Sequence, residues 1–208
     1  MRTSKKAILA ALHELYPDAR PELNFTNPYE TLVAVMLSAQ CTDKMVNKVT
    51  PAVFARYPDV ASMAAATVED LHPMVKACGF KSKATNIIET CKLLMLRHGG
   101  EVPRTMEELT ALPGVGRKTA NLLLGDLYDT PGSVVCDTHC IRICGRLGLS
   151  KGKEPEKVER QLRQILPPEE SNDFCHRIVL FGREICTARK PKCTECPLAM
   201  HCQEVNLG

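Results

Sequence analysis

The strongest constraint on the fold of this chain is a group of four cysteines near its C-terminus. Within seventeen residues they follow the spacing C-x6-C-x2-C-x5-C, at Cys186, Cys193, Cys196 and Cys202. Four thiolates in so short a loop can surround one soft metal ion or hold a cuboidal iron–sulfur cluster. Zinc sites usually show two C-x2-4-C knuckles, and this loop has only one. The spacing therefore favours an iron–sulfur cluster, with zinc as the alternative.

The other cysteines indicate a reducing compartment. The chain has 208 residues, of which eleven are cysteines, and no cleavage site follows the N-terminal apolar stretch. An odd cysteine count without an export signal argues against a disulfide framework. The apolar run at residues 32–37 is far too short to span a bilayer. We therefore expect a cytoplasmic protein without a membrane partner, whose remaining cysteines are small core residues. A second metal site is the alternative for three of them, Cys136, Cys140 and Cys144, because they recur every four residues.

Charge and aromatic content limit the nucleic-acid partners that this chain could bind. The formal net charge of +3 alone is too small to prove such a partner. The absence of Trp argues against a single-strand binder built on rows of stacking rings. The cysteine loop, however, carries Arg189, Lys190 and Lys192 between its first two cysteines, with no acidic residue in that interval. These cations could clamp a phosphate backbone, and a solvated basic turn is the alternative.

The start and stop signals in the sequence are almost entirely those of helices. Asn27, Thr67 and Thr105 are each followed three residues later by an acidic residue, as in an N-terminal capping box. Apolar residues three and four apart follow these starts, as in the two stripes Ile87, Cys91, Leu94, Met95 and Ala120, Leu123, Leu124, Leu127. The one short β-like piece is residues 133–135. We expect an all-α protein of about ten helices.

Residues 112–120, LPGVGRKTA, predict a helix-hairpin-helix. A helix over residues 105–112 should end at Pro113, and a glycine-containing turn should lead into a helix that carries Lys118. Glycines permit positive φ, and the amides at the new helix N-terminus favour an anion such as a DNA phosphate. An ordinary αα-corner is the alternative, but two adjacent cations favour DNA. The hairpin residues expected to contact DNA are Gly114, Val115, Gly116 and Arg117.

With these motifs in place, the sequence resembles the endonuclease III family of helix-hairpin-helix DNA glycosylases. The resemblance runs, in the family's order, through ELNFTNPYETLVAVMLSAQCTD, LPGVGRKTA, VVCDTHCIRICGRLG and the four-cysteine loop. It implies a two-lobed all-α fold with DNA bound in a cleft between the lobes. Residues 21–132 would form a central six-helix lobe containing the hairpin. Residues 1–20 and 133–208 together would form a second lobe that holds a 4Fe–4S cluster on the four cysteines.

The resemblance also implies an enzyme of base excision repair. The family excises oxidised pyrimidines from double-stranded DNA and then cleaves the abasic site by β-elimination, and we expect this chain to do so as a monomer. By the same resemblance Lys118 is the nucleophile, Asp137 is the second catalytic residue, and Gln40 fills the gap left by the extruded base. Asp137 could instead be a simple helix N-cap.

Phe80 is the candidate for an apolar wedge that enters the duplex. The loop after Gly79 is one residue shorter than the family's pattern, so Phe80 as a core residue is the alternative. Two other functions remain open at this point, a glycosylase without lyase activity and a non-catalytic DNA-binding iron–sulfur protein. A primary amine at Lys118 favours the bifunctional enzyme, because an amine that displaces the base can stay attached as a Schiff base and so support strand cleavage.

Overall fold

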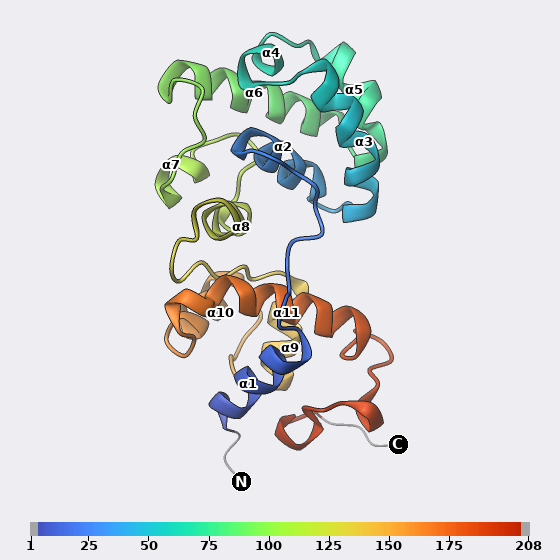
Figure 1. Ribbon diagram of the computed structural model, residues 1–208, viewed down its shortest axis with the longest axis vertical. Coiled ribbons are helices and arrows are strands. Elements are labelled where there is room, and N and C mark those ends of the chain that lie inside the picture. Colours follow the sequence, from blue (N-terminus) through green and yellow to red (C-terminus); the bar gives the residue numbers. More distant parts are fainter. Residues whose placement is uncertain (1–3, 205–208) are drawn as a thin grey trace. The chain divides into compact units, whose positions relative to one another are not determined.

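The computed structural model describes residues 4–204, which form helices joined by loops (Figure 1). Within this range there are eleven α-helices and four 3-10 helices, and no strand. The expected all-α class is confirmed. The β-like residues 133–135 lie in a buried extended loop, where the Val135 amide donates to the Cys175 sulfur at 3.2 Å. No helix in the described range is both long enough and apolar enough to span a bilayer.

The chain divides into two compact units, and the first is Pro21–Tyr128. The sequence predicts the end of this unit after residue 132. The resemblance implies six helices, whereas the unit has seven α-helices, two of which, α4 and α7, are only five residues long. In chain order its elements are α2 (Pro28–Ser38), α3 (Asp43–Arg56), α4 (Val60–Ala64), α5 (Val68–Val75), η1 (Lys76–Cys78), α6 (Lys81–Arg97), α7 (Met106–Thr110) and α8 (Arg117–Tyr128).

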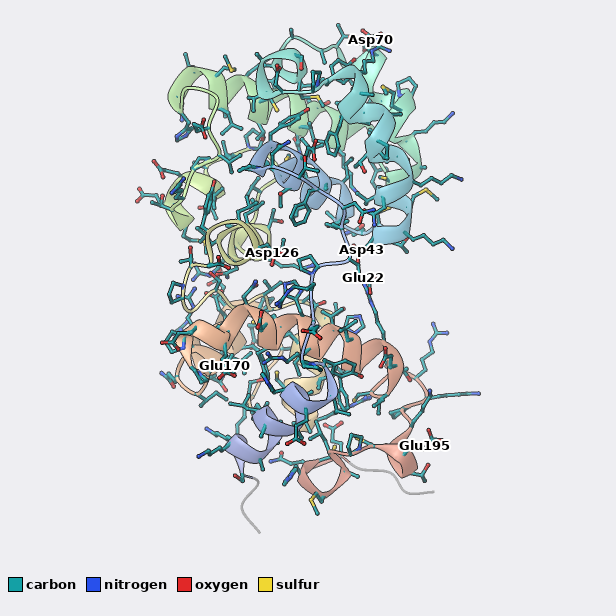
Figure 2. The ribbon with its side chains drawn as sticks, viewed as in Figure 1. Glu22, Asp43, Asp70, Asp126, Glu170 and Glu195 are labelled. Atoms are coloured by element: carbon teal, nitrogen blue, oxygen red, sulfur yellow. The ribbon has the colours of Figure 1, made fainter. Side chains whose placement is uncertain are left out.

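At the three predicted helix starts in this unit, the N-cap half of the predicted capping box is present. The Asn27 side chain accepts from the Glu30 amide at 2.9 Å, at the start of α2. Thr67 accepts from the Asp70 amide at 3.2 Å, and Figure 2 labels this aspartate on α5. Thr105 accepts from the Glu108 amide at 3.3 Å, at the start of α7. Each cap satisfies an amide that has no partner within the helix.

The core of the first unit is built around α2, which contacts α3, α6 and α8 (Figure 1). Every residue of α2 from Tyr29 to Leu37, except Glu30, is buried, as expected of a helix surrounded by others. The predicted stripe on α8 is largely buried, with Leu127 at its edge. On α6 the first three residues of the predicted stripe, Ile87, Cys91 and Leu94, are buried. Met95 is 46% exposed, because Leu94 takes the inward position and the next residue points about 100° away from it.

The second unit combines Met1–Arg20 with Asp129–Gly208. Its described elements are α1 (Lys5–Leu15), α9 (Thr138–Arg146), α10 (Pro155–Arg163), η2 (Pro168–Glu170), α11 (Ser171–Glu184), η3 (Cys193–Glu195) and η4 (Ala199–His201). Helix α11 packs against both α9 and α1 (Figure 1). The Tyr16 hydroxyl donates to the Glu184 carboxylate at 2.8 Å, and Arg177 donates to the Tyr16 carbonyl at 3.3 Å. The N-terminal helix is thus held on the C-terminal part of the chain.

The cysteines outside the C-terminal loop are mostly core residues, as predicted. Cys41 is partly exposed, and the other six are buried, namely Cys78, Cys91, Cys136, Cys140, Cys144 and Cys175. The sulfurs of Cys140 and Cys144 lie 4.0 Å apart on one face of α9. No group of three or more His, Cys, Asp or Glu within residues 4–204 could hold a single metal ion. The alternative of a second metal site on α9 stays a hypothesis.

Candidate functional site

The four cysteines of the C-terminal loop line one cavity of about 200 Å³. Two 3-10 turns bring them together, because Cys193 begins η3 and Cys202 directly follows η4. Leu147, Phe181 and Ile185 line the same cavity and give it an apolar wall. All four thiols are partly buried. The predicted ligands therefore surround a common space that opens at the surface of the second unit.

The chemistry of this cavity fits a bound metal group that is held by several thiolates. Burial raises the pKa of the Cys196 and Cys202 thiols above the ordinary value. Four thiolates there need a bound cationic group to offset the cost of their burial.

Helix α9 supports the first cysteine of the loop through two arginines, Arg142 and Arg146. Arg146 donates to the Cys186 sulfur at 3.2 Å and to the Thr187 carbonyl at 3.0 Å. Arg142 donates to the Cys186 carbonyl at 3.0 Å. A cation beside a ligating sulfur stabilises its thiolate form and fixes its orientation. The four-residue spacing of the two arginines is a signal on one helix face, but their partners lie forty or more residues away.

We expect the protein prepared without oxygen to be yellow-brown, with about four irons and four sulfides per chain. Cys186→Ser should lose the colour and the folded structure of the loop, because metal ligation and folding are coupled. Iron and sulfide analysis with visible absorption spectroscopy measures both. Cys91→Ala is the matched control, since Cys91 is buried in the first unit, and it should keep the colour. Stoichiometric zinc without visible absorption would contradict the assignment.

The helix-hairpin-helix is present, with a shorter first helix than predicted. Helix α7 ends at Thr110, and the chain then turns through an amide–carbonyl bond of 3.1 Å from Val115 to Leu112. Gly114 has φ +76°, and a Cβ there would lie 2.8 Å from the Asn86 side-chain nitrogen of α6. Glycine is thus required both by the backbone conformation and by the close approach. Gly116 has open space around it and no positive φ, so the same reason does not apply to it.

Lys118 lies in the first turn of α8, directly after this turn. Its side chain is exposed, and Ala120 and Leu123 on the same helix are fully buried. The buried face of α8 thus fixes the backbone from which the amine projects. The amides of the first helical turn point in the direction in which an anion binds. The structure therefore brings the predicted nucleophile and the predicted phosphate-binding turn together.

Asp137 is the N-cap of α9, in the second unit. Its Oδ1 accepts from the Cys140 amide at 2.7 Å, and the side chain is half-buried. Within the described part of the chain no hydrogen bond joins Oδ2 to another residue. The N-cap interpretation is correct as a description of the contact. It leaves one carboxylate oxygen for a second role.

Gln40 and Phe80 are both exposed in the first unit. Gln40 follows the end of α2 with φ +57°, in the left-handed region that residues other than glycine rarely adopt. Phe80 precedes α6, and its side chain is 79% exposed. The alternative that Phe80 is a core residue is therefore wrong. A phenylalanine that is exposed to this extent does not contribute to the core.

The three cations of the cysteine loop are all exposed. The backbone next to them is held in place, because Arg146 donates to the Ala188 carbonyl at 3.4 Å and the Lys192 amide donates to the Ile185 carbonyl at 3.0 Å. Glu195 in η3, labelled in Figure 2, lies beyond this basic stretch. Contact of Arg189, Lys190 and Lys192 with phosphate remains a prediction.

Two family matches cover most of the chain. Residues 33–168 match the HhH-GPD superfamily of base excision DNA repair proteins. Residues 186–202 match the iron–sulfur binding domain of endonuclease III. The second match begins and ends at the first and last cysteine of the loop.

Curated proteins and solved structures with similar sequences carry the same family name. Endonuclease III of Synechocystis sp. (strain ATCC 27184 / PCC 6803 / Kazusa) is 44% identical over 94% of this chain and 90% of its own. Endonuclease III of Escherichia coli (strain K12) is 42% identical over 97% of this chain and 96% of its own. A structure of a trapped covalent intermediate of endonuclease III with DNA is similar, with a TM-score of 0.91, 41% identity and coverage of 97% of this chain and 96% of that one. A thermostable thymine-DNA glycosylase, at 21% identity and a TM-score of 0.83, shares the fold.

Proposed function

Because this chain belongs to the endonuclease III family of base excision DNA repair proteins, we propose that it removes oxidised pyrimidines from duplex DNA. The chain is a DNA glycosylase that also has abasic-site lyase activity, and both activities are those of this family. The class of damaged base and the residues that act on it are part of this proposal. We further propose that the enzyme works as a monomer in the cytoplasm, associated with DNA.

The observation that carries this proposal is the position of Lys118. A primary amine projects from the first turn of α8, beside a turn whose backbone suits a phosphate. The turn would hold the DNA backbone through Gly114, Val115, Gly116 and Arg117. A flipped nucleotide next to a bound phosphate would then present its sugar to the amine. A monofunctional glycosylase or a non-catalytic binding protein has no use for an amine at this place.

The reaction starts when the damaged nucleotide leaves the base stack, which costs a few kcal/mol and least for a base that stacks poorly. The Lys118 amine attacks C1′, the bond from C1′ to the base breaks, and the base leaves with a proton. The C1′–O4′ bond then breaks as the remaining amine proton passes to O4′, which gives an imine between the lysine and the opened sugar. The imine acidifies the 2′ hydrogen, and its removal expels the 3′ phosphate and breaks the strand. Water then hydrolyses the imine and restores the amine.

We assign Asp137 to charge stabilisation in the first step. Positive charge develops on the sugar as the base departs, and a nearby carboxylate lowers the energy of that state. The N-cap bond to Cys140 would hold the carboxylate in one orientation while its second oxygen faces the sugar. Asp137 thus serves both the helix and the reaction.

The remaining predicted residues bind DNA in this proposal. Gln40 fills the gap left by the extruded base, and Phe80 enters the duplex as the wedge. Exposure of both side chains supports these roles. Arg189, Lys190 and Lys192 contact backbone phosphates. A 4Fe–4S cluster is the cofactor, and when bound to Cys186, Cys193, Cys196 and Cys202 it cross-links the loop that carries these cations.

The test uses duplexes that contain thymine glycol, an intact abasic site or no lesion. We expect strand cleavage without alkali at both the thymine glycol and the abasic site, with a product ending that is typical of β-elimination. Undamaged DNA should remain intact. Denaturing gel electrophoresis and analysis of the released base measure the two steps separately.

Other outcomes would assign the chain to a different function. Release of the base with cleavage only after alkali treatment would mean a glycosylase without lyase activity. Binding without either step would mean a non-catalytic DNA-binding protein. Cleavage of the abasic site alone would refute the proposed class of damaged base while leaving the lyase chemistry in place.

A further inference from the structure

The Lys83 side chain joins two segments of the first unit through three hydrogen bonds. Its ammonium donates to the carbonyls of Leu37 at 2.7 Å, Ala39 at 2.5 Å and Cys78 at 2.5 Å. A lysine ammonium has three N–H donors and accepts none, so these carbonyls use its full capacity.

The three carbonyls belong to the two segments that precede Gln40 and Phe80. Leu37 and Ala39 lie at the C-terminal end of α2, directly before Gln40. Cys78 ends η1 and is separated from Phe80 by Gly79 alone. The last carbonyls of a helix have no partner within the helix and carry partial negative charge, so a cation there is stabilising. Lys83 thus caps α2 and ties its end to the loop that carries Phe80.

Neither exposed residue has packing of its own that would hold it in position. Gln40 is exposed and has φ +57°, a conformation with little intrinsic stability for a residue with a side chain. Gly79 has φ +129°, and a Cβ there would lie 3.5 Å from the Lys83 side chain. The loop therefore runs along the lysine before it reaches Phe80. The backbone contacts of Lys83 tie the segments before the two residues to each other.

The electrostatic surroundings of Lys83 favour donation from its ammonium to the three carbonyls. Burial lowers the pKa of Lys83, while Cys41 and Cys78 act in the opposite direction. Burial, together with the neighbouring Cys41 thiol, raises the pKa of Cys78 to about 11, so this thiol is neutral at pH 7. The carbonyls are then the principal acceptors for the ammonium. Hydrogen bonds to the charged form stabilise it.

We propose that Lys83 is a positioning residue for base extrusion, which holds the Gln40 and Phe80 segments as one rigid element that enters the duplex together. The inference rests on the proposed roles of Gln40 and Phe80 in DNA. It explains how a loop one residue shorter than the family's pattern still presents Phe80 at a defined place. Lys83 itself needs no contact with DNA or with the reacting atoms.

The test compares Lys83→Met with Lys81→Met on two substrates. Lys81 lies in the same helical turn and makes only an exposed ion pair with Glu69 at 3.4 Å, so its substitution removes the same charge without the three carbonyl bonds. One substrate is duplex DNA with thymine glycol, which requires extrusion. The other is single-stranded DNA with an abasic site, where no duplex has to be opened. Single-turnover rates on both are measured, together with the fluorescence of 2-aminopurine placed opposite the lesion.

We expect Lys83→Met to slow excision from the duplex about 10- to 100-fold and to reduce the fluorescence change. Cleavage of the single-stranded abasic site should stay within about two-fold, as should both rates of Lys81→Met. Combining Lys83→Met with Gln40→Ala and Phe80→Ala should add little to the loss caused by those two changes, because coupled residues are not additive. Lys83→Gln is shorter and keeps two N–H donors, and it should show the same dependence on substrate with a smaller loss.

Equal losses on both substrates, in the methionine or the glutamine variant, would overturn the proposal, since they indicate a general structural role. The same loss in Lys81→Met would also overturn it, because removal of charge would then suffice. Normal excision by Gln40→Ala and Phe80→Ala would instead refute the proposed roles of those two residues. The two failures are therefore distinguishable.

Discussion

Lys118→Gln should abolish strand cleavage and covalent trapping by borohydride, while binding to damaged duplex DNA stays within about ten-fold of the unchanged protein. Glutamine is similar in length but has no nucleophilic amine, so neither the imine nor the β-elimination that depends on it can form. Borohydride added during turnover of the unchanged protein should reduce the imine to a stable amine. Digestion of the adduct and mass spectrometry should locate the DNA on Lys118.

Lys92→Gln is the matched control for this experiment. Lys92 is an exposed lysine on α6 whose ammonium pairs with Glu89 at 2.9 Å, so its loss removes the same charge without touching the hairpin. This variant should cleave and trap normally. Continued release of the damaged base by Lys118→Gln would show that water is the nucleophile. In that case the bifunctional assignment of Lys118 would be wrong, even though the fold and the cluster loop would be unaffected.

Features that depend on neighbouring residues could be predicted from the sequence. The helix starts at Asn27, Thr67 and Thr105 follow from a side chain that bonds an amide three residues ahead, and all three are present. The glycine in the hairpin turn at Gly114 is likewise a local requirement of the backbone. The spacing of the four cysteines indicated a shared site because chain length alone limits how far apart they can lie.

Features that depend on distant partners could not be predicted in this way. The Leu37 carbonyl that accepts from Lys83 is forty-six residues away in the chain, and the Arg146 bond to Cys186 spans forty residues. A lysine or an arginine at a helix surface has the same local pattern whether it faces solvent or carbonyl groups. Phe80 was ambiguous for a similar reason, since exposure depends on what the rest of the fold leaves uncovered.

Asp137→Asn should reduce the rate of base excision about 10²–10³-fold and leave the thermal stability nearly unchanged. Asparagine is as good an N-cap as aspartate, so the bond to the Cys140 amide can be kept while the charge is lost. The expected loss corresponds to about 2.7–4 kcal/mol of charge stabilisation in the transition state. Single-turnover excision of thymine glycol, with a thermal unfolding curve for each variant, measures the two effects separately.

Asp137→Ala separates the cap from the charge, because alanine provides neither. It should lose excision to a similar extent as the asparagine variant and in addition lose about 0.5–2 kcal/mol of stability. Cleavage of a preformed abasic site should suffer less in both variants, since no glycosidic bond has to break and less positive charge develops on the sugar. If asparagine restores both stability and excision while alanine lowers both, Asp137 is only a helix cap. The negative charge that offsets the positive charge on the sugar must then come from another residue.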